Sequence, residues 1–248
     1  MSFGLGHGRE LDDAPGVIGV ARDEIPPLPD EAITNPDAGL LDPRAWFADP
    51  QRPFEIEIGS GKGAFLLAQA AASPGVNYLG IEWAREFYLY AADRLRRAGV
   101  ANVRMLNADA TEFLRWRCPP GIARVIHLYF SDPWPKSRHH KNRVVQDAFL
   151  AQCLRVLAPG GELRLVTDHP DLWTWYRAHI ARWTTTEAWA KVPERCAPND
   201  DRSRPPFDER PYTPPDWVSP GELIGTNYER KYRAEGRGFN STILVKPA

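Results

Sequence analysis

Short apolar runs alternate with longer segments of helical spacing between residues 54 and 192. The apolar runs are FEIEI, NYLGI, VRML, RVIHLYF and ELRLV, which start at Phe54, Asn77, Val103, Arg124 and Glu162. Most of them are too continuous for strands with one solvated face, and they suit a parallel sheet that is covered on both faces. We therefore predict a strand at each of these five runs.

Apolar residues at helical spacing occupy the segments between the predicted strands. These segments are GAFLLAQAAA, AREFYLYAADRLRRAG and NRVVQDAFLAQCLRVLAPGG, and the last two stop at Gly99 and at Gly160. Farther along, three tryptophans at 173, 175 and 183 predict a helix packed after the fifth strand, GTNYERKYRAEG predicts a charged helix, and STILVKP predicts a final strand. This alternation indicates a doubly wound α/β fold with helices on both faces of the sheet.

Proline divides the chain into regions. Residues 1–53 hold eight prolines and residues 193–220 another eight, whereas residues 54–192 hold seven. We expect an extended, partly disordered N-terminal arm over 1–53 and a single domain over 54–248, with a proline-rich insertion at about 191–224.

Charge and cysteine content narrow the classes of partner. The formal net charge of the 248 residues is −1, so a nucleic acid would have to meet a local basic surface. The three cysteines are widely spaced, which argues against a disulfide framework or a zinc site. The N-terminus lacks the apolar region of a secretion signal, and AFLLAQAAA is too short to cross a bilayer. We expect a cytoplasmic protein without a membrane partner.

A glycine-rich turn, EIGSGKGAF, follows the first predicted strand directly. Gly59, Gly61 and the acid Glu82 after the second strand satisfy a dinucleotide fingerprint, but Gly63 after Lys62 lacks the hydroxyl of a phosphate-binding P-loop. Glu57 decides between the remaining cofactors. A carboxylate just before the turn would repel a pyrophosphate and would attract the cationic methionine moiety of S-adenosylmethionine.

An acid-Pro-aromatic segment, SDPWPK, follows the fourth predicted strand. Asp132 therefore falls at the carboxyl end of a strand, where open α/β sheets bind ligands. Pro133 and Pro135 restrict the backbone around Trp134, as expected where one group must be presented rigidly. The segment resembles the motif by which methyltransferases that act on base nitrogens hold their target, in which the aromatic ring stacks on the base and the acid meets its edge.

A basic run comes next, from Lys136 to Arg143. Its position beside the predicted cofactor crevice favours contacts with RNA phosphates over an ordinary solvated loop. The adjacent histidines have neither helical i, i+4 spacing nor a paired carboxylate, so we expect no metal site. The residues predicted to contact RNA are Arg138, His139, His140, Lys141, Asn142 and Arg143.

These motifs together resemble the bacterial tRNA (guanine-N(7)-)-methyltransferase family. In chain order the shared motifs are EIGSGKG, GIE, the Asp-Ala pair at 109–110, DPWPKSRHHK, the Thr-Asp pair at 167–168 and TNYE at 226–229. They span roughly residues 54–230, and their joint occurrence is far more specific than any one of them. The resemblance implies a class I methyltransferase with a mostly parallel, seven-stranded sheet.

The resemblance also implies roles for single residues. S-adenosylmethionine, converted to S-adenosylhomocysteine, would lie among Glu57, Gly59, Gly61, Glu82, Asp109 and Asp132. The target guanine would be contacted by Lys136, Asp168, Thr226, Asn227, Tyr228 and Glu229. The resemblance implies methylation of N(7) of a guanine in tRNA, at position 46 of the variable loop.

The chemistry of guanine agrees with these residue types. N(7) carries a lone pair and no proton, so the transfer needs alignment and no general base. The purine ring becomes cationic, and carboxylates facing it would stabilise that charge, with Asp132 the first candidate for catalysis. Alternatives are another RNA substrate, an NAD-dependent dehydrogenase or a non-catalytic RNA-binding module, and the sequence leaves monomer and homodimer open.

Overall fold

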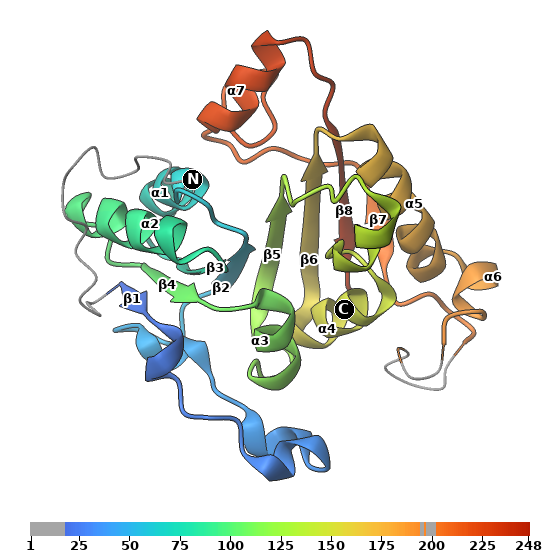
Figure 1. Ribbon diagram of the computed structural model, residues 1–248, viewed down its shortest axis with the longest axis horizontal. Helices are drawn as coiled ribbons and strands as arrows, with labels where there is room; N and C mark the ends of the chain where they lie inside the picture. Colours follow the sequence, from blue (N-terminus) through green and yellow to red (C-terminus); the bar gives the residue numbers. More distant parts are fainter. Residues whose placement is uncertain (1–17, 194–195, 197–201) are drawn as a thin grey trace. The chain divides into compact units, whose positions relative to one another are not determined.

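Two compact units make up the chain in the computed structural model, which describes residues 18–193, 196 and 202–248. The first unit comprises Met1–Pro119 with Thr213–Ala234, and the second comprises Pro120–Tyr212 with Glu235–Ala248. Each unit contains parallel strands and helices (Figure 1). The first 17 residues of the expected N-terminal arm lie outside the described residues.

The first unit holds four parallel strands in the order β1-β4-β3-β2. Their bounds are Gly19–Val20 (β1), Phe54–Ile58 (β2), Asn77–Glu82 (β3) and Val103–Asn107 (β4). The helices are Ala64–Ala72 (α1), Arg85–Arg97 (α2), Ala110–Trp116 (α3) and Asn227–Ala234 (α7). Helix α1 packs on β3, and α2 packs on β3 and β4, which buries Leu66, Ala70, Tyr78, Tyr88, Leu95, Val103 and Met105 in one core.

Close packing at the middle of β3 requires a glycine. A Cβ atom on Gly80 would lie 2.4 Å from Cδ1 of Leu66 and 2.6 Å from Sδ of Met105. The register between neighbouring strands aligns their ends: Glu57 of β2 pairs with Gly80 of β3, and Glu82 of β3 pairs with Asn107 of β4. Since the strands are parallel, their carboxyl ends and the acids on them meet at one edge.

The described part of the N-terminal arm, residues 18–53, is anchored to the first unit. β1 extends the sheet, and four short 3-10 helices follow it at Arg22–Glu24, Asp30–Ile33, Pro36–Gly39 and Pro43–Trp46. The guanidinium group of Arg117 donates hydrogen bonds to the carbonyl oxygens of Pro26 and Gly39, and Arg104 donates to that of Trp46.

The second unit has the strand order β5-β6-β8-β7. Its strands are Ala123–Tyr129 (β5), Leu157–Thr167 (β6), Asp208–Arg210 (β7) and Asn240–Val245 (β8). β5 and β6 are parallel, and β8 runs antiparallel to both β6 and β7. The helices are Asp147–Val156 (α4), Pro170–Thr184 (α5) and Thr186–Trp189 (α6), and α4 and α5 pack on β6.

The α/β fold with mostly parallel strands is confirmed, with two corrections. The described residues form eight strands instead of seven; β1 lies in the arm and β7 in the proline-rich segment. The helix expected up to Gly160 ends at Val156, because Leu157 pairs with Ala123 at the start of β6 and Pro159 disfavours a helical residue before it.

Candidate functional site

Three glycines form the turn between β2 and α1. Gly59, Gly61 and Gly63 have φ angles of 74°, 52° and 65°, a left-handed conformation that favours glycine. Apart from the glycine itself and its two chain neighbours, no atom of the described residues lies within 4 Å of a Cβ built on Gly59 or Gly61. The backbone of the turn is therefore open to a ligand at these two positions.

The carboxylate of Glu82 holds this turn in place. One oxygen accepts a hydrogen bond from the backbone N–H of Gly61 at 2.8 Å, and the other accepts from that of Ala84 at 2.8 Å. Because each carboxylate oxygen has two acceptor sites, one lone pair on each remains for a ligand hydroxyl pair. Glu82 is therefore oriented before any ligand binds.

Glu57 carries a buried carboxyl group at the end of β2. Its side chain is 5% exposed, and its Oε2 atom has no hydrogen-bond partner among the described residues. Burial raises the pKa of this carboxyl to about 8, and the nearby charge of Glu82 adds to the increase. A cation beside Glu57 would supply the missing partner, so the group fits the cationic methionine moiety of S-adenosylmethionine.

Asp109 caps α3. Its Oδ1 atom accepts hydrogen bonds from the backbone N–H of Thr111 at 2.8 Å and from the Thr111 hydroxyl at 2.6 Å. The carboxylate is thus held by its own helix, and only Oδ2 lacks a hydrogen bond within the described part of the chain.

Trp83 is an exposed aromatic residue beside Glu82 that the sequence analysis did not single out. It follows Glu82 directly and is 66% exposed, although a tryptophan is normally buried. Asn107 donates hydrogen bonds to the carbonyl oxygens of Glu82 and Trp83 at 2.8 and 2.9 Å, which fixes their backbone. Its position directly after a strand-terminal acid places it beside the candidate cofactor groups along the chain.

In the second unit, the segment after β5 has an unusual backbone. Phe130 and Trp134 have φ angles of 55° and 43°, a region that costs a non-glycine residue roughly 1–3 kcal/mol. Asp132 lies between them, is exposed and has no hydrogen bond or ion pair among the described residues. Its carboxylate is therefore available to a ligand.

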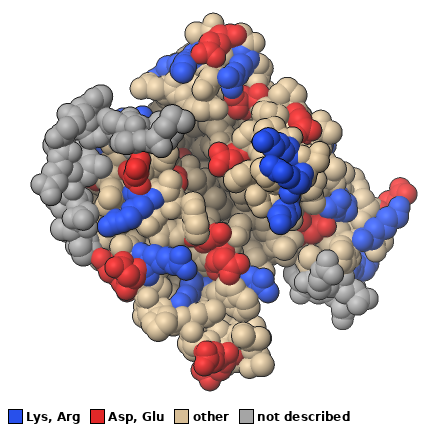
Figure 2. Space-filling view, in the orientation of Figure 1, with Lys and Arg blue, Asp and Glu red and all other residues tan. Residues whose placement is uncertain are grey.

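The basic run forms a short 3-10 helix, Ser137–Asn142. Lys136, Arg138, Lys141 and Asn142 are exposed, whereas His139 packs against the Trp134 ring at 5.8 Å and His140 against the Trp175 ring at 5.7 Å. Figure 2 shows basic and acidic side chains mixed over one face of the protein, with one compact group of Lys and Arg. The exposed members of the run give the protein a local positive surface despite its net charge of −1.

Arg143, the last residue of the run, lies in the interior. Its side chain is 1% exposed, and its Nε atom donates a hydrogen bond to the Pro133 carbonyl oxygen at 2.9 Å. Its guanidinium group also pairs with Asp171 and lies 5.3 Å from the centre of the Trp175 ring. In this arrangement Arg143 is not presented to RNA phosphates with its exposed neighbours.

The predicted guanine contacts fall in both units. Asp168 follows β6 in the second unit and accepts a hydrogen bond from Arg237 at 2.7 Å, so a guanine would have to share or replace this ion pair. In the first unit, Thr226 directly precedes α7, and its first turn contains Asn227, Tyr228 and Glu229.

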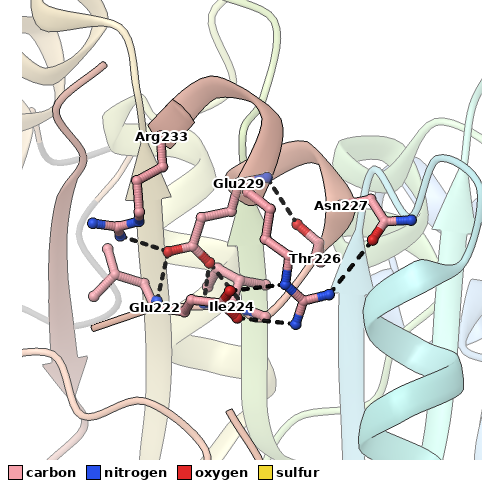
Figure 3. Close-up of polar contacts among 9 residues, drawn as sticks. Glu222, Ile224, Thr226, Asn227, Glu229 and Arg233 are labelled. Carbon is pink, nitrogen blue, oxygen red and sulfur yellow. Dashed lines mark hydrogen bonds and ion pairs between the residues drawn. The ribbon is translucent and has the colours of Figure 1, made fainter. Parts of the chain in front are cut away.

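Glu229 is fully buried and holds the loop before α7 together. Its carboxylate accepts hydrogen bonds from the backbone N–H groups of Leu223, Ile224 and Gly225 at 2.6, 2.8 and 3.0 Å and from Arg233 at 2.7 Å. Figure 3 shows this carboxylate directed at the loop, while Asn227 lies apart from it and accepts a hydrogen bond from Arg230. Glu229 therefore organises the loop, and Asn227 and Tyr228 are the exposed members of the group.

The described residues lack two kinds of feature. None of these residues forms a group of three or more His, Cys, Asp or Glu side chains that could hold a metal ion. Across the same residues, every helix is too short or too polar to span a bilayer.

Comparisons with known proteins point to one family. The model of the family described as "Putative methyltransferase" matches residues 51–207. A tRNA (guanine-N(7)-)-methyltransferase of Geobacillus kaustophilus is 36% identical over 79% of this chain and 80% of its own. The enzyme of the same name from Nitrobacter hamburgensis is 35% identical over 75% of this chain and 65% of its own.

Among solved structures, the 16S rRNA methyltransferase KamB matches with a TM-score of 0.49 and 14% identity, over 89% of this chain and 94% of that chain. A likeness this distant carries no information on function.

The alignment with the Nitrobacter protein spans slightly less than two thirds of that relative. The family match nevertheless covers more than half of this chain, and the Geobacillus match covers most of both chains. The chain belongs to the tRNA (guanine-N(7)-)-methyltransferase family.

Proposed function

We propose that this protein transfers the methyl group of S-adenosylmethionine to N(7) of a guanine in tRNA, at position 46 of the variable loop. Beyond family membership, the observation that carries this proposal is the buried Glu57, whose unpartnered carboxylate oxygen stands beside an open glycine turn. A buried carboxylate in that position favours a cationic ligand over a dinucleotide pyrophosphate, which supports S-adenosylmethionine over NAD.

The first unit provides the groups that hold the cofactor. The open turn at Gly59 and Gly61 would let the cofactor approach the protein backbone closely, and Glu57 would bind the positive end of the cofactor. The carboxylate oxygens of Glu82 would accept hydrogen bonds from the ribose hydroxyls, and Asp109 would lie by the adenine. When bound, the cofactor supplies a methyl group on a cationic sulfonium, which is activated for direct displacement.

Asp132 is the carboxylate that we assign to the guanine. N(7) attacks through its lone pair and loses no proton, so the residues align the base and stabilise the positive charge that develops on it. Asp132 has no hydrogen-bond partner within the described residues, whereas Asp168 is paired with Arg237 and Glu229 is committed to its loop. Asp132 therefore has the most acceptor capacity left for the ring nitrogen and the amino group of guanine.

The exposed residues Lys136, Arg138 and Lys141 bind the RNA. They lie within nine residues of Asp132 along the chain, so phosphate contacts made by them bring the nucleotide near that carboxylate. His139 and Asn142 extend the same surface, while Arg143 and His140 face inward. Asn227 and Tyr228 offer exposed groups for further contacts with the base.

The direct test is incubation of the purified protein with bulk tRNA and labelled S-adenosylmethionine. Borohydride reduction and aniline cleavage then locate N(7)-methylguanine, and we expect cleavage at position 46 of the variable loop. Methylation at another guanine would contradict the site assignment. An absence of methyl transfer to any tRNA would contradict the function.

Replacing Asp132 tests its role in the transfer. We expect Asp132→Ala to lower kcat by roughly 100- to 1000-fold, because a preorganised charge facing the reacting base is removed. The matched control is Glu187→Ala, which removes an acid with a 92% exposed side chain from the same unit and leaves turnover unchanged. Wild-type turnover in the Asp132 variant would remove this residue from the mechanism.

A further inference from the structure

The segment Phe130 to Trp134 is held in a conformation that it would not adopt alone. Both end residues have positive φ angles, and neither is a glycine. Such backbone strain persists only where the surrounding structure holds it, and it concentrates at functional sites. The contacts that hold this segment are therefore the ones that place Asp132.

Two buried side chains hold the segment on either side of Asp132. The hydroxyl of Ser131 makes a hydrogen bond of 2.7 Å with the hydroxyl of Tyr176, which is fully buried in α5. The carbonyl oxygen of Pro133 accepts the hydrogen bond of 2.9 Å from Nε of Arg143. The residues immediately before and after Asp132 are thus both tied to the interior of the second unit.

Arg143 is itself fixed by two further contacts. Asp171, at the start of α5, pairs with its guanidinium group, and the ring of Trp175 from the same helix lies against it. Burying a guanidinium group is costly, and the cost is offset only by this complete set of partners. With a side chain 1% exposed, Arg143 has no surface to offer a phosphate, so its position needs another explanation.

We propose that Arg143 and Tyr176 are positioning residues, which clamp the strained segment 130–134 to α5 and thereby aim the carboxylate of Asp132 at the target guanine. This inference rests on the proposed function for the role of Asp132, but the clamp itself is a property of the second unit alone. It assigns to Arg143 a role distinct from that of its exposed neighbours Arg138 and Lys141.

Three variants weaken the clamp without removing its packing. Tyr176→Phe deletes only the hydroxyl that meets Ser131. Arg143→Lys keeps the positive charge beside Asp171 but removes the planar Nε–H donor that meets Pro133. Asp171→Asn removes the charge that fixes the guanidinium group, and its own side chain is 56% exposed, so folding is little disturbed.

The expected result is a loss of rate with tRNA affinity retained. A misplaced Asp132 should lower kcat by roughly 10- to 100-fold in Tyr176→Phe and Arg143→Lys, because small errors in alignment are costly. The dissociation constant for tRNA and its salt dependence should match the parent, since every phosphate-binding side chain is retained. Hydrogen exchange measured by mass spectrometry should accelerate at the amides of residues 130–136.

The matched control is Arg182→Lys on α5, the helix that also carries Asp171 and Tyr176. Arg182 makes a two-pronged ion pair with Asp147 at 3.1 and 2.9 Å and does not touch the strained segment. We expect the loss of thermal stability in this variant to be comparable to that in Arg143→Lys. Its kcat and its hydrogen exchange at residues 130–136 should stay unchanged.

Three outcomes would overturn the inference: unchanged exchange at residues 130–136 in all three clamp variants, faster exchange with parental kcat, or a loss confined to tRNA affinity. Absence of methyl transfer by the parent protein would instead contradict the proposed function, and the exchange measurement would still test the clamp. Faster exchange together with a lower kcat, absent from the control, would support the inference.

Discussion

Glu57 shows how one buried carboxyl group can link pH to both stability and ligand binding. Its pKa is about 8 because burial disfavours the charged form, and an unfolded chain would return it to 4.5. Between these values the folded state binds the proton more strongly. Stability from this group therefore falls as pH rises from about 4.5 to about 8, no more steeply than about 1.4 kcal/mol per pH unit.

We predict that Glu57 releases a proton when S-adenosylmethionine binds. A cation stabilises the carboxylate, so below pH 8 binding must expel the proton, and affinity should rise from pH 6 to pH 8. Calorimetry at pH 6.5 in buffers of different ionisation enthalpy measures the release. In Glu57→Gln the affinity should be lower and the heat independent of buffer. Equal buffer dependence in both proteins would contradict this role.

At the scale of an element, Glu229 holds the loop 222–226 at the start of α7. Burial alone would raise its pKa, but the hydrogen bonds from Arg233 and from the backbone N–H groups of residues 223–225 lower it overall. The stability that it contributes is therefore present above the ordinary carboxyl pKa and is lost as pH falls through the lower folded value.

We predict that Glu229→Gln lowers the free energy of unfolding by roughly 2–4 kcal/mol at pH 7, because donors that now meet a carboxylate would meet an amide nitrogen. Chemical denaturation measures the loss, which should shrink under acidic conditions. Glu222→Gln is the control on the same loop, since its partner Arg230 is half exposed and solvent screens the pair, so the loss should be much smaller than for Glu229→Gln. Equal losses in both variants would contradict the role of Glu229.

At the scale of the whole molecule, a net charge of −1 gives no general attraction to nucleic acid. We predict that charge reversal at Arg138 and Lys141 weakens tRNA binding. The logarithmic dependence of affinity on salt should also flatten, by roughly one unit for each phosphate that the variant no longer neutralises. Titrations at several salt concentrations measure the slope. Affinity for S-adenosylmethionine should stay the same.

Lys191→Glu is the matched control for charge. Its side chain is 74% exposed and lies in the same unit, outside the basic run. The slope for this variant should match the parent, because only charges at the contact surface release counterions. A slope in the Arg138 and Lys141 variant equal to that of Lys191→Glu would overturn the assigned RNA surface.

Much of the fold followed from local pattern. The runs at Phe54, Asn77 and Val103 became β2, β3 and β4, because continuous apolar character suits strands buried on both faces. The two-residue strand β1 was missed, since it has no periodicity of its own and pairs with β4, which lies far along the chain. For the same reason, pattern gave no sign that Arg104 and Arg117 anchor the arm.

The candidate site was also only partly predictable from the sequence. The order and types of the motif residues, from Glu57 through Asp132 to Glu229, were enough to identify the family, and the match to known relatives agrees with them. The sequence did not indicate which of these residues are exposed. Burial depends on partners distant in sequence, such as Asp171 for Arg143, whereas exposure of Lys136 or Asp132 depends on the absence of such partners.

The sequence by itself determined the fold class, the family and the set of charged residues available for chemistry, because those depend on local periodicity and on residue identity. Tertiary structure alone decided that Arg143 turns inward to hold the Pro133 carbonyl and that Glu229 is committed to the loop before α7. The physical reason is desolvation. A charge removed from water must find its partners inside the fold, and those partners are known only once the chain has been packed.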